Sequence, residues 1–400
     1  MKAVYIVDAV RTPIGKYGGV LSSVRPDDML AHVIRAVLDR NPGIDENAIE
    51  DVIAGAANQS GEDNRNVARM AALLAGLPQH IPGVTVNRLC ASGLQSIMDA
   101  SRMIATGDAE LVIACGVESM SRAPYVVAKS ASGFDRSVQM YDTTMGWRFV
   151  NKKLADAYHP YSMGETAENV AEKWNISRHA QDEFAYSSQE KYAEALKNNK
   201  WEDEIIPVRV SSGKDIIDVD QDEHPRLSSM EKLGQLKPAF KQNGTVTAGN
   251  SSGINDGAAA MLLASEDAVR KYGLKTLARV RSMAVAGVDP AVMGIGPVPA
   301  TKKALDRAGL TVNDIDLIEL NEAFASQSIA CIHDLDLDLQ KVNVNGGSIA
   351  LGHPLGCSGV RISTTLLHEM KRRNSRYGLA TMCVGVGQGA AIIFESEPKK

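Results

Sequence analysis

The chain has 400 residues, of which 44% are hydrophobic and 23% charged, as in an ordinary globular protein, and this length predicts two or three domains. Its net charge of −5 argues against a general nucleic-acid binder, and no apolar run approaches the ~20 residues that cross a membrane. The five cysteines (90, 115, 331, 357 and 383) lack the paired spacing of a metal site, so we expect free thiols, no metal and a cytoplasmic protein without a signal peptide.

The first 121 residues alternate short apolar runs with amphipathic segments. The runs predict strands at 3–7, 51–57 and 110–115, and the amphipathic segments predict helices that begin near Pro26, Val67 and Leu94. Strands that alternate with helices of this length favour a mostly parallel sheet covered by helices.

Residues 122–248 have a different character, because strand runs become rare there. Amphipathic helices are predicted at 165–174 and 178–199, a short strand at 205–210 and a charged connection at 215–224. We interpret this region as a domain inserted into the first unit, which residues 249–272 then complete with a buried strand at 258–264.

A second α/β unit is predicted over residues 273–400. Its strands are expected at 279–286, 315–319, 380–384 and 390–394, and its helices at 300–308, 322–333 and 360–371. Three of its segments echo the first unit: 316–318 resembles 51–53, 357–359 resembles 91–93, and 380–386 resembles 111–117. These matches indicate a duplicated domain whose equivalent loops would meet, although matches this short also arise by coincidence.

Residues 84–93 join a β-branched run to a helix through a sharp turn that contains Cys90. A thiol at such a turn faces unpaired backbone N–H groups and the positive end of the helix dipole, and both favour a nucleophilic thiolate. The alternative is a small core side chain, which is a common environment of free cysteines.

Three loops in the second unit carry further polar residues. Asn321 follows a strand, His353 lies in a glycine-rich loop before a helix, and Cys383 precedes a G-x-G-x-G run at 385–389. The alternatives are a helix cap, a structural histidine and a core cysteine. The glycine run is a weak dinucleotide fingerprint, because only eleven residues follow it. A nucleophilic cysteine, a histidine base, a second thiol that moves protons, and glycine N–H groups together suit acyl transfer through a thioester.

The sequence resembles the thiolase family (acetyl-CoA acyltransferases) along its whole length. The resemblance rests on five motifs: Asn87-Arg88-Leu89-Cys90-Ala91-Ser92-Gly93, Gly116-Val117-Glu118-Ser119-Met120-Ser121, Asn321-Glu322-Ala323-Phe324, Gly352-His353-Pro354 and Cys383-Val384-Gly385-Val386-Gly387. It implies an α/β thiolase fold with two duplicated βαβαβαββ core domains packed in layers (1–121 with 249–272, and 273–400), an inserted loop domain (122–248), and a homodimer or homotetramer.

The resemblance also implies roles for these residues. Cys90 would attack the 3-keto carbon of a 3-oxoacyl-CoA while His353 takes its proton, and Cys383 would protonate the acetyl-CoA enolate and then activate an incoming CoA. One oxyanion site would be His353 with a water on Asn321, and the other the N–H groups of Cys90 and Gly385. CoA is thus a substrate, and no cofactor, nucleic acid or membrane is expected. Matched binding residues are Ser252 and Arg226 for CoA, and Met163, Met293 and Phe324 for the acyl pocket.

Ser162 departs from acetoacetyl-CoA-specific members, which carry histidine there. Segments 61–69 and 142–151 instead resemble the 3-oxoadipyl-CoA thiolases of aromatic-acid breakdown. Their acyl tail ends in a carboxylate, which is unfavourable to bury without a cation. Arg148 is the predicted partner and Arg65 the second, with subunit-interface ion pairs as the alternative for both.

Other functions remain open at this point. A general 3-oxoacyl-CoA or acetoacetyl-CoA thiolase is the first alternative, and a non-catalytic acyl-CoA carrier of the same fold is the second. A decarboxylating condensing enzyme would lack the second thiol. A carrier should have lost Cys90, His353 or Cys383, and this chain has all three.

Overall fold

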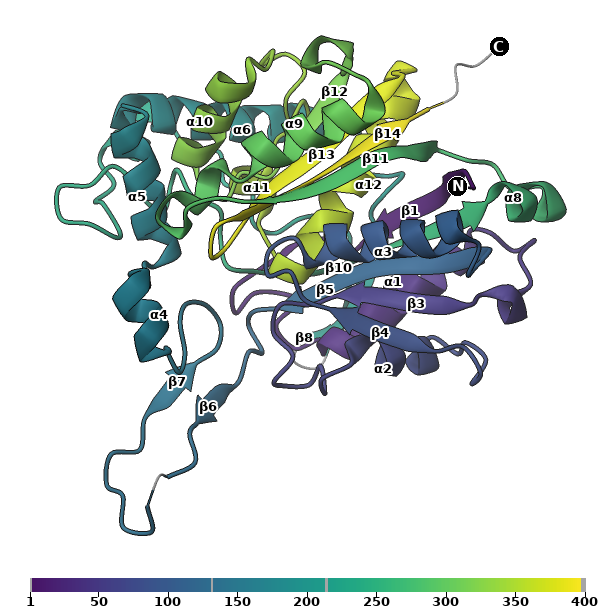
Figure 1. The fold of residues 1–400 in the computed structure, drawn as a ribbon, viewed down its shortest axis with the longest axis horizontal. Coiled ribbons are helices and arrows are strands. Elements are labelled where there is room, and N and C mark those ends of the chain that lie inside the picture. Colours follow the sequence, from purple (N-terminus) through teal and green to yellow (C-terminus); the bar gives the residue numbers. More distant parts are fainter. Residues whose placement is uncertain (1, 131, 213–214, 397–400) are drawn as a thin grey trace.

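A computed structural model describes residues 2–130, 132–212 and 215–396 (Figure 1). Among these residues, ten strands form one central sheet in the order β12-β13-β14-β11-β1-β10-β5-β3-β4, with β2 beside β10. Their bounds are β1 Val4–Arg11, β2 Gly15–Lys16, β3 Asp51–Gly55, β4 Gly83–Val86, β5 Leu111–Ser119, β10 Asn255–Ser265, β11 Ala278–Gly287, β12 Leu317–Leu320, β13 Tyr377–Val384 and β14 Gln388–Glu395.

The sheet consists of two similar halves that meet at β1 and β11. Strand β3 runs parallel to β5 in the first half, as β12 runs parallel to β13 in the second. β1 and β11 pair over only two positions, Tyr5 with Arg279 and Ile6 with Ala278. The segments that echo each other in sequence therefore lie on equivalent elements: 51–53 and 316–318 on β3 and β12, 111–117 and 380–386 on β5 and β13, and 91–93 and 357–359 at the starts of α3 and α12, which confirms the duplication.

The prediction of a mostly parallel sheet was wrong, because the sheet is mixed. β10 is antiparallel to β5, and β14 is antiparallel to β13. The last two strands are joined by residues 385–387 alone, and a connection this short can link only antiparallel neighbours.

Helices form three layers around and between the two halves. α1 and α2 cover the outer face of the first half, and α9 and α10 cover that of the second. α3 and α12 lie in the middle, where their apolar side chains contact both halves of the sheet. The helices span α1 Pro26–Asp39, α2 Val67–Leu74, α3 Ser92–Thr106, α4 Lys152–Ala157, α5 Met163–Lys173, α6 Arg178–Lys197, α7 Met230–Gly234, α8 Glu266–Tyr272, α9 Pro297–Ala308, α10 Ala325–Leu335, α11 Ser348–Leu351 and α12 Leu355–Arg373.

Between β5 and β10 the chain leaves the central sheet. A hairpin of β6 (Tyr125–Val127) and β7 (Met140–Asp142) projects from the body (Figure 1), while α5 and α6 pack against α10. The region predicted as a charged connection begins with a strand instead, since β9 (Asp215–Val219) pairs with β8 (Val208–Ser212). The domain boundaries given above stay predictions. Within the described ranges, no helix combines the length and apolar character needed to cross a membrane.

The inserted region is tied to the first strand by buried charges. The Arg11 guanidinium donates to Asp222 at 2.6 and 3.0 Å and to Glu204 at 2.6 Å, and it lies over the Trp201 ring. Separating a buried ion pair leaves an uncompensated charge, which is strongly unfavourable. This contact therefore holds the inserted region against the core.

Candidate active site

The candidate site forms where α3 and α12 approach each other closely. A Cβ on Gly93 would lie 2.8 Å from the backbone oxygen of Gly356, and one on Gly359 would lie 2.0 Å from the backbone nitrogen of Leu94. Only glycine allows this separation. The contact brings the starts of both helices together, and Cys90 and His353 each lie just before one of those starts.

Hydrogen bonds fix the turn that carries Cys90. The Arg88 N–H donates to the Ser92 hydroxyl oxygen at 2.9 Å, and that hydroxyl donates to the Leu89 carbonyl at 2.6 Å. Leu89 adopts a φ of 46°, in the left-handed region that few side chains occupy. The hydrogen bonds of Ser92, rather than the conformational preference of Leu89, therefore hold the backbone of this turn.

The thiol of Cys90 is half-buried and accepts hydrogen bonds from the backbone N–H groups of Gly385 and of Cys90 itself. Burial raises the pKa of Cys90, and these N–H groups oppose that rise without cancelling it. The backbone N–H groups at the turn favour a thiolate, as expected, but burial has the larger effect. Cys90 needs a base to ionise.

His353 is buried in the loop between α11 and α12. Its Nδ1 lies 2.6 Å from the Ser358 hydroxyl oxygen, and the single proton of that hydroxyl is donated to the Pro354 carbonyl at 2.8 Å. Nδ1 therefore carries the ring proton, and Nε2 is unprotonated and can accept a proton. Burial lowers the pKa of His353 to about 3, with the Arg361 guanidinium as the second cause, so the ring is a neutral base.

The loop geometry of His353 depends on one glycine. Gly352 has a φ of 106°, and a Cβ there would lie 2.5 Å from the Asn255 side chain. The side-chain oxygen of Asn255 accepts the backbone N–H of His353 at 2.9 Å. The loop is thus locked to β10.

Asn321 lies behind His353 and does not cap a helix. Its Nδ2 is 3.4 Å from His353 Nε2, and its Oδ1 accepts the Ser348 hydroxyl proton at 2.6 Å. α10 has Phe324 at its N-cap and no side-chain cap. The amide of Asn321 therefore faces the histidine, as the thiolase resemblance implies.

Cys383 ends β13 on the opposite side of the site. Its side chain is 1% exposed and packs against apolar neighbours that include Met293 and Phe324. Burial raises the pKa of Cys383, and the nearby Cys90 thiol raises it further. The following turn has left-handed backbone at Val386 (φ 62°) and Gly387 (φ 77°), which turns the Gly385 N–H towards Cys90.

A cavity of about 620 Å³ joins these groups, and with the exception of Asn321 and Arg65 every predicted site residue lines it. These residues are Cys90, His353, Cys383, Gly385, Met163, Met293, Phe324, Ser252, Arg226 and Arg148. A cavity of this size suits a small organic ligand.

The two arginines proposed for a tail carboxylate are separated by the structure. Arg148 is half-buried on the cavity wall, and in the described part of the chain its guanidinium has no hydrogen bond or ion pair. The neighbouring Trp147 indole donates to the Tyr161 carbonyl at 2.9 Å, which fixes this segment. Arg65 is exposed and is not among the residues that line the cavity.

Sequence reasoning missed the role of Glu118, which also lines the cavity. Its carboxylate accepts backbone N–H groups of Ala57, Asn58 and Gly356 at 2.9, 3.0 and 2.8 Å. Burial raises the pKa of Glu118 to about 7. Glu118 thus joins the loop after β3 to the start of α12. The sequence could not predict this role, because its partners are backbone N–H groups and no residue type marks them.

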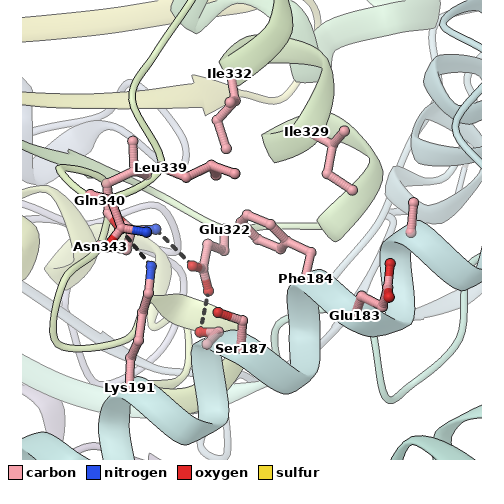
Figure 2. A pocket seen from close by; sticks show the side chains of 13 residues that line it. Glu183, Phe184, Ser187, Lys191, Glu322, Ile329, Ile332, Leu339, Gln340 and Asn343 are labelled. Carbon is pink, nitrogen blue, oxygen red and sulfur yellow. Dashed lines mark hydrogen bonds between the residues drawn. The ribbon is translucent and has the colours of Figure 1, made fainter.

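A second cavity, of about 410 Å³, lies between α6, α10 and residues 339–343 (Figure 2). None of the predicted catalytic residues lines it. On its wall the Glu322 carboxylate accepts from Asn343 and Ser188, both at 2.7 Å (Figure 2). It also accepts the Ile349 N–H at 3.1 Å. These bonds hold the loop after β12 against α11. Because Asn321 is the residue before Glu322 in that loop, they also help to fix its position.

Comparisons with known proteins agree with this geometry. The family model "Thiolase, N-terminal domain" matches residues 4–267, and "Thiolase, C-terminal domain" matches residues 274–396. The chain is 55% identical over 399 residues to the 3-oxoadipyl-CoA/3-oxo-5,6-dehydrosuberyl-CoA thiolase of Escherichia coli K12, with 99% of this chain and 100% of that protein covered.

Two solved structures are similar over the whole chain. The Bacillus anthracis acetyl-CoA acetyltransferase has a TM-score of 0.93 at 41% identity, with 99% of each chain covered. Human mitochondrial 3-ketoacyl-CoA thiolase in complex with CoA has a TM-score of 0.92 at 43% identity, with 99% of this chain and 98% of that chain covered.

Proposed function

This chain belongs to the thiolase family of acyltransferases, and from that premise we propose that it cleaves 3-oxoadipyl-CoA with CoA to succinyl-CoA and acetyl-CoA. The observation that carries the proposal is the meeting of Cys90, His353 and Cys383 on one cavity. The 3-oxoadipyl-CoA substrate is supported by the full-length identity of 55% to the Escherichia coli enzyme of that name.

We assign the first half-reaction to Cys90 and His353. The Cys90 sulfur attacks the 3-keto carbon, and its proton passes to Nε2 of His353, which is the unprotonated ring nitrogen. The N–H groups of Cys90 and Gly385 donate hydrogen bonds to the keto oxygen as it becomes negative. The C2–C3 bond then breaks, and its electron pair forms the enolate of acetyl-CoA.

We assign the proton transfers that follow to Cys383. Its thiol protonates C2 of the enolate, and acetyl-CoA leaves. The resulting thiolate takes the proton of an incoming CoA, whose sulfur attacks the acyl group on Cys90. Cys90 recovers its proton from His353, and every group returns to its starting state. Asn321, with a water, would hold the enolate oxygen beside His353.

Ser252 and Arg226 are the proposed contacts to CoA. The Ser252 N–H donates to the Ala323 carbonyl at 3.0 Å, which joins its loop to the motif that contains Asn321. Arg226 lies on an exposed part of the cavity wall, where its guanidinium donates to the Ala248 carbonyl at 2.7 Å. This placement suits a charged end of CoA at the entrance.

A homodimer or homotetramer is proposed from exposed apolar surface. β4 is an edge strand with Val84 44% exposed, and Phe134, between β6 and β7, is 96% exposed. Apolar side chains this exposed on an edge and on a projecting hairpin favour a contact with another copy of the chain. Light scattering after size-exclusion chromatography tests this proposal, and cell fractionation tests the cytoplasmic location.

Steady-state cleavage of 3-oxoadipyl-CoA in the presence of CoA tests the function directly. We expect succinyl-CoA and acetyl-CoA in equal amounts, and without CoA no more than one acetyl-CoA for each active site and no succinyl-CoA. Binding of the substrate without cleavage would instead indicate an acyl-CoA carrier.

A further inference from the structure

A line of hydrogen bonds runs from the middle of α12 to the candidate base. Nη2 of Arg361 donates to the Ser348 hydroxyl oxygen at 2.5 Å, and this hydroxyl lies 2.6 Å from Oδ1 of Asn321. Nδ2 of the same amide lies 3.4 Å from Nε2 of His353. Arg361, Ser348 and Asn321 are all buried to 1% exposure or less, so water does not compete freely for these contacts.

The direction of each hydrogen bond follows from the first donor. A guanidinium can only donate, so the Ser348 oxygen is an acceptor towards Arg361 and its own proton is free for Asn321. That proton requires an acceptor, which places Oδ1 of the amide towards Ser348. Nδ2 then has to face His353, whose Nε2 is itself an acceptor.

The opposite orientation of the amide would leave several polar groups unpaired. Nδ2 would face the Ser348 oxygen, which already accepts from Arg361, and the Ser348 proton would lose its acceptor. Oδ1 would face the lone pair on Nε2 of His353. Buried polar groups without partners are strongly disfavoured, so Ser348 selects one orientation of Asn321.

We propose that Ser348, held by Arg361, is a positioning residue that turns the N–H₂ group of Asn321 towards His353 and the bound enolate. This inference rests on the proposed function, because it concerns how fast the same reaction runs. Arg361 suits the task because Ser348 accepts its one hydrogen bond, while Nε and Nη1 have no hydrogen-bond partner among the described residues. The Glu319 carboxyl lies 3.7 Å from Nη1 of Arg361.

The test is a double-mutant cycle on thiolysis of 3-oxoadipyl-CoA, with Ser348→Ala, Asn321→Ala and the double variant. Ser348→Ala should lower kcat by about three- to tenfold, the effect of one lost hydrogen bond, and should change KM for CoA by less than twofold. The double variant should match Asn321→Ala, because Ser348 acts only through that amide. Ser348→Ala leaves the buried guanidinium of Arg361 without its one hydrogen bond, so the unfolding temperature of each variant is measured beside kcat to confirm that it folds.

Ser363→Ala is the matched control. Like Ser348, this serine is buried, but it lies on α12 and its hydroxyl donates to the Gly359 carbonyl, four residues earlier. Because this hydrogen bond does not reach Asn321, kcat should stay at the wild-type value. Equal kcat for Ser348→Ala and wild type, or losses that add in the double variant, would overturn the inference. A wild-type enzyme without thiolysis would overturn the proposed function itself, and the inference with it.

Discussion

Replacing Arg148 with glutamine tests the assignment of the substrate's tail. The guanidinium lies on the wall of the catalytic cavity and is unpaired within the described ranges, so the variant removes a positive charge without breaking an ion pair there. The segment should keep its place, because the Trp147 indole bonds to the Tyr161 carbonyl independently of Arg148. The change therefore acts on the ligand rather than on the fold.

The size of the effect follows from the burial of the arginine. A charge-assisted hydrogen bond contributes roughly 1.5–3 kcal/mol. Arg148 is half-buried, so partial screening by solvent favours the lower half of that range. We expect kcat/KM for 3-oxoadipyl-CoA to fall by about 10- to 45-fold. Cleavage of 3-oxohexanoyl-CoA, which has the same length without the carboxylate, should be nearly unchanged.

The assay is kcat/KM for both substrates with three variants measured side by side. Arg65→Gln, on an arginine that does not line the cavity, should behave as wild type. Arg226→Gln should weaken both substrates equally, because its proposed contact is with the CoA part that they share. Equal losses on both substrates in Arg148→Gln would refute the tail contact. A wild-type preference for the neutral tail would make a general 3-oxoacyl-CoA thiolase the better description.

Three further predictions concern the catalytic groups. Iodoacetamide should label Cys90 before Cys331, because the Cys331 thiol is fully buried and its pKa is raised well above the usual value. Peptide mapping that found Cys331 labelled first would contradict this. Cys383→Ala should still transfer an acyl group from a simple acyl-CoA to Cys90, but should lose about 10²–10⁴ in thiolysis, and near-normal thiolysis would assign the proton transfer elsewhere. The pKa of His353 is lowered by burial from 6.5 to about 3, so below pH 6.5 the unfolded chain binds a proton that the folded chain refuses. Its contribution to stability is therefore fully present above pH 6.5 and is lost as the pH falls towards 3, and His353→Asn should show a shallower loss of unfolding free energy over that range.

Periodicity alone predicted most of the helices and strands, because each one buries a face that its own sequence specifies. The helix expected to begin near Pro26 is α1, which begins at that residue with proline in its first turn, where the missing N–H is harmless. The helix predicted at 178–199 is α6, Arg178–Lys197. β9 was missed because its residues are largely exposed, so no apolar alternation marks the strand.

Only part of the chemistry of the site could be predicted from the sequence. Cys90 at a helix start, His353 in a glycine loop and Cys383 before a glycine turn are local features, and motif order identified the family from them. The pKa of Cys90 could not be predicted from its neighbours in the sequence, because burial raises it by more than the nearby backbone N–H groups lower it.

Only the tertiary structure decided which groups meet. Arg148 and Arg65 are equivalent as sequence, and the fold places one on the cavity and leaves the other exposed. Ser348 and Arg361 carry no motif, and their link to Asn321 exists because α12 packs behind β12. A periodic pattern reports which face of an element is buried. It does not report what lies against that face, and hydrogen-bond partners and burial energies depend on that neighbour.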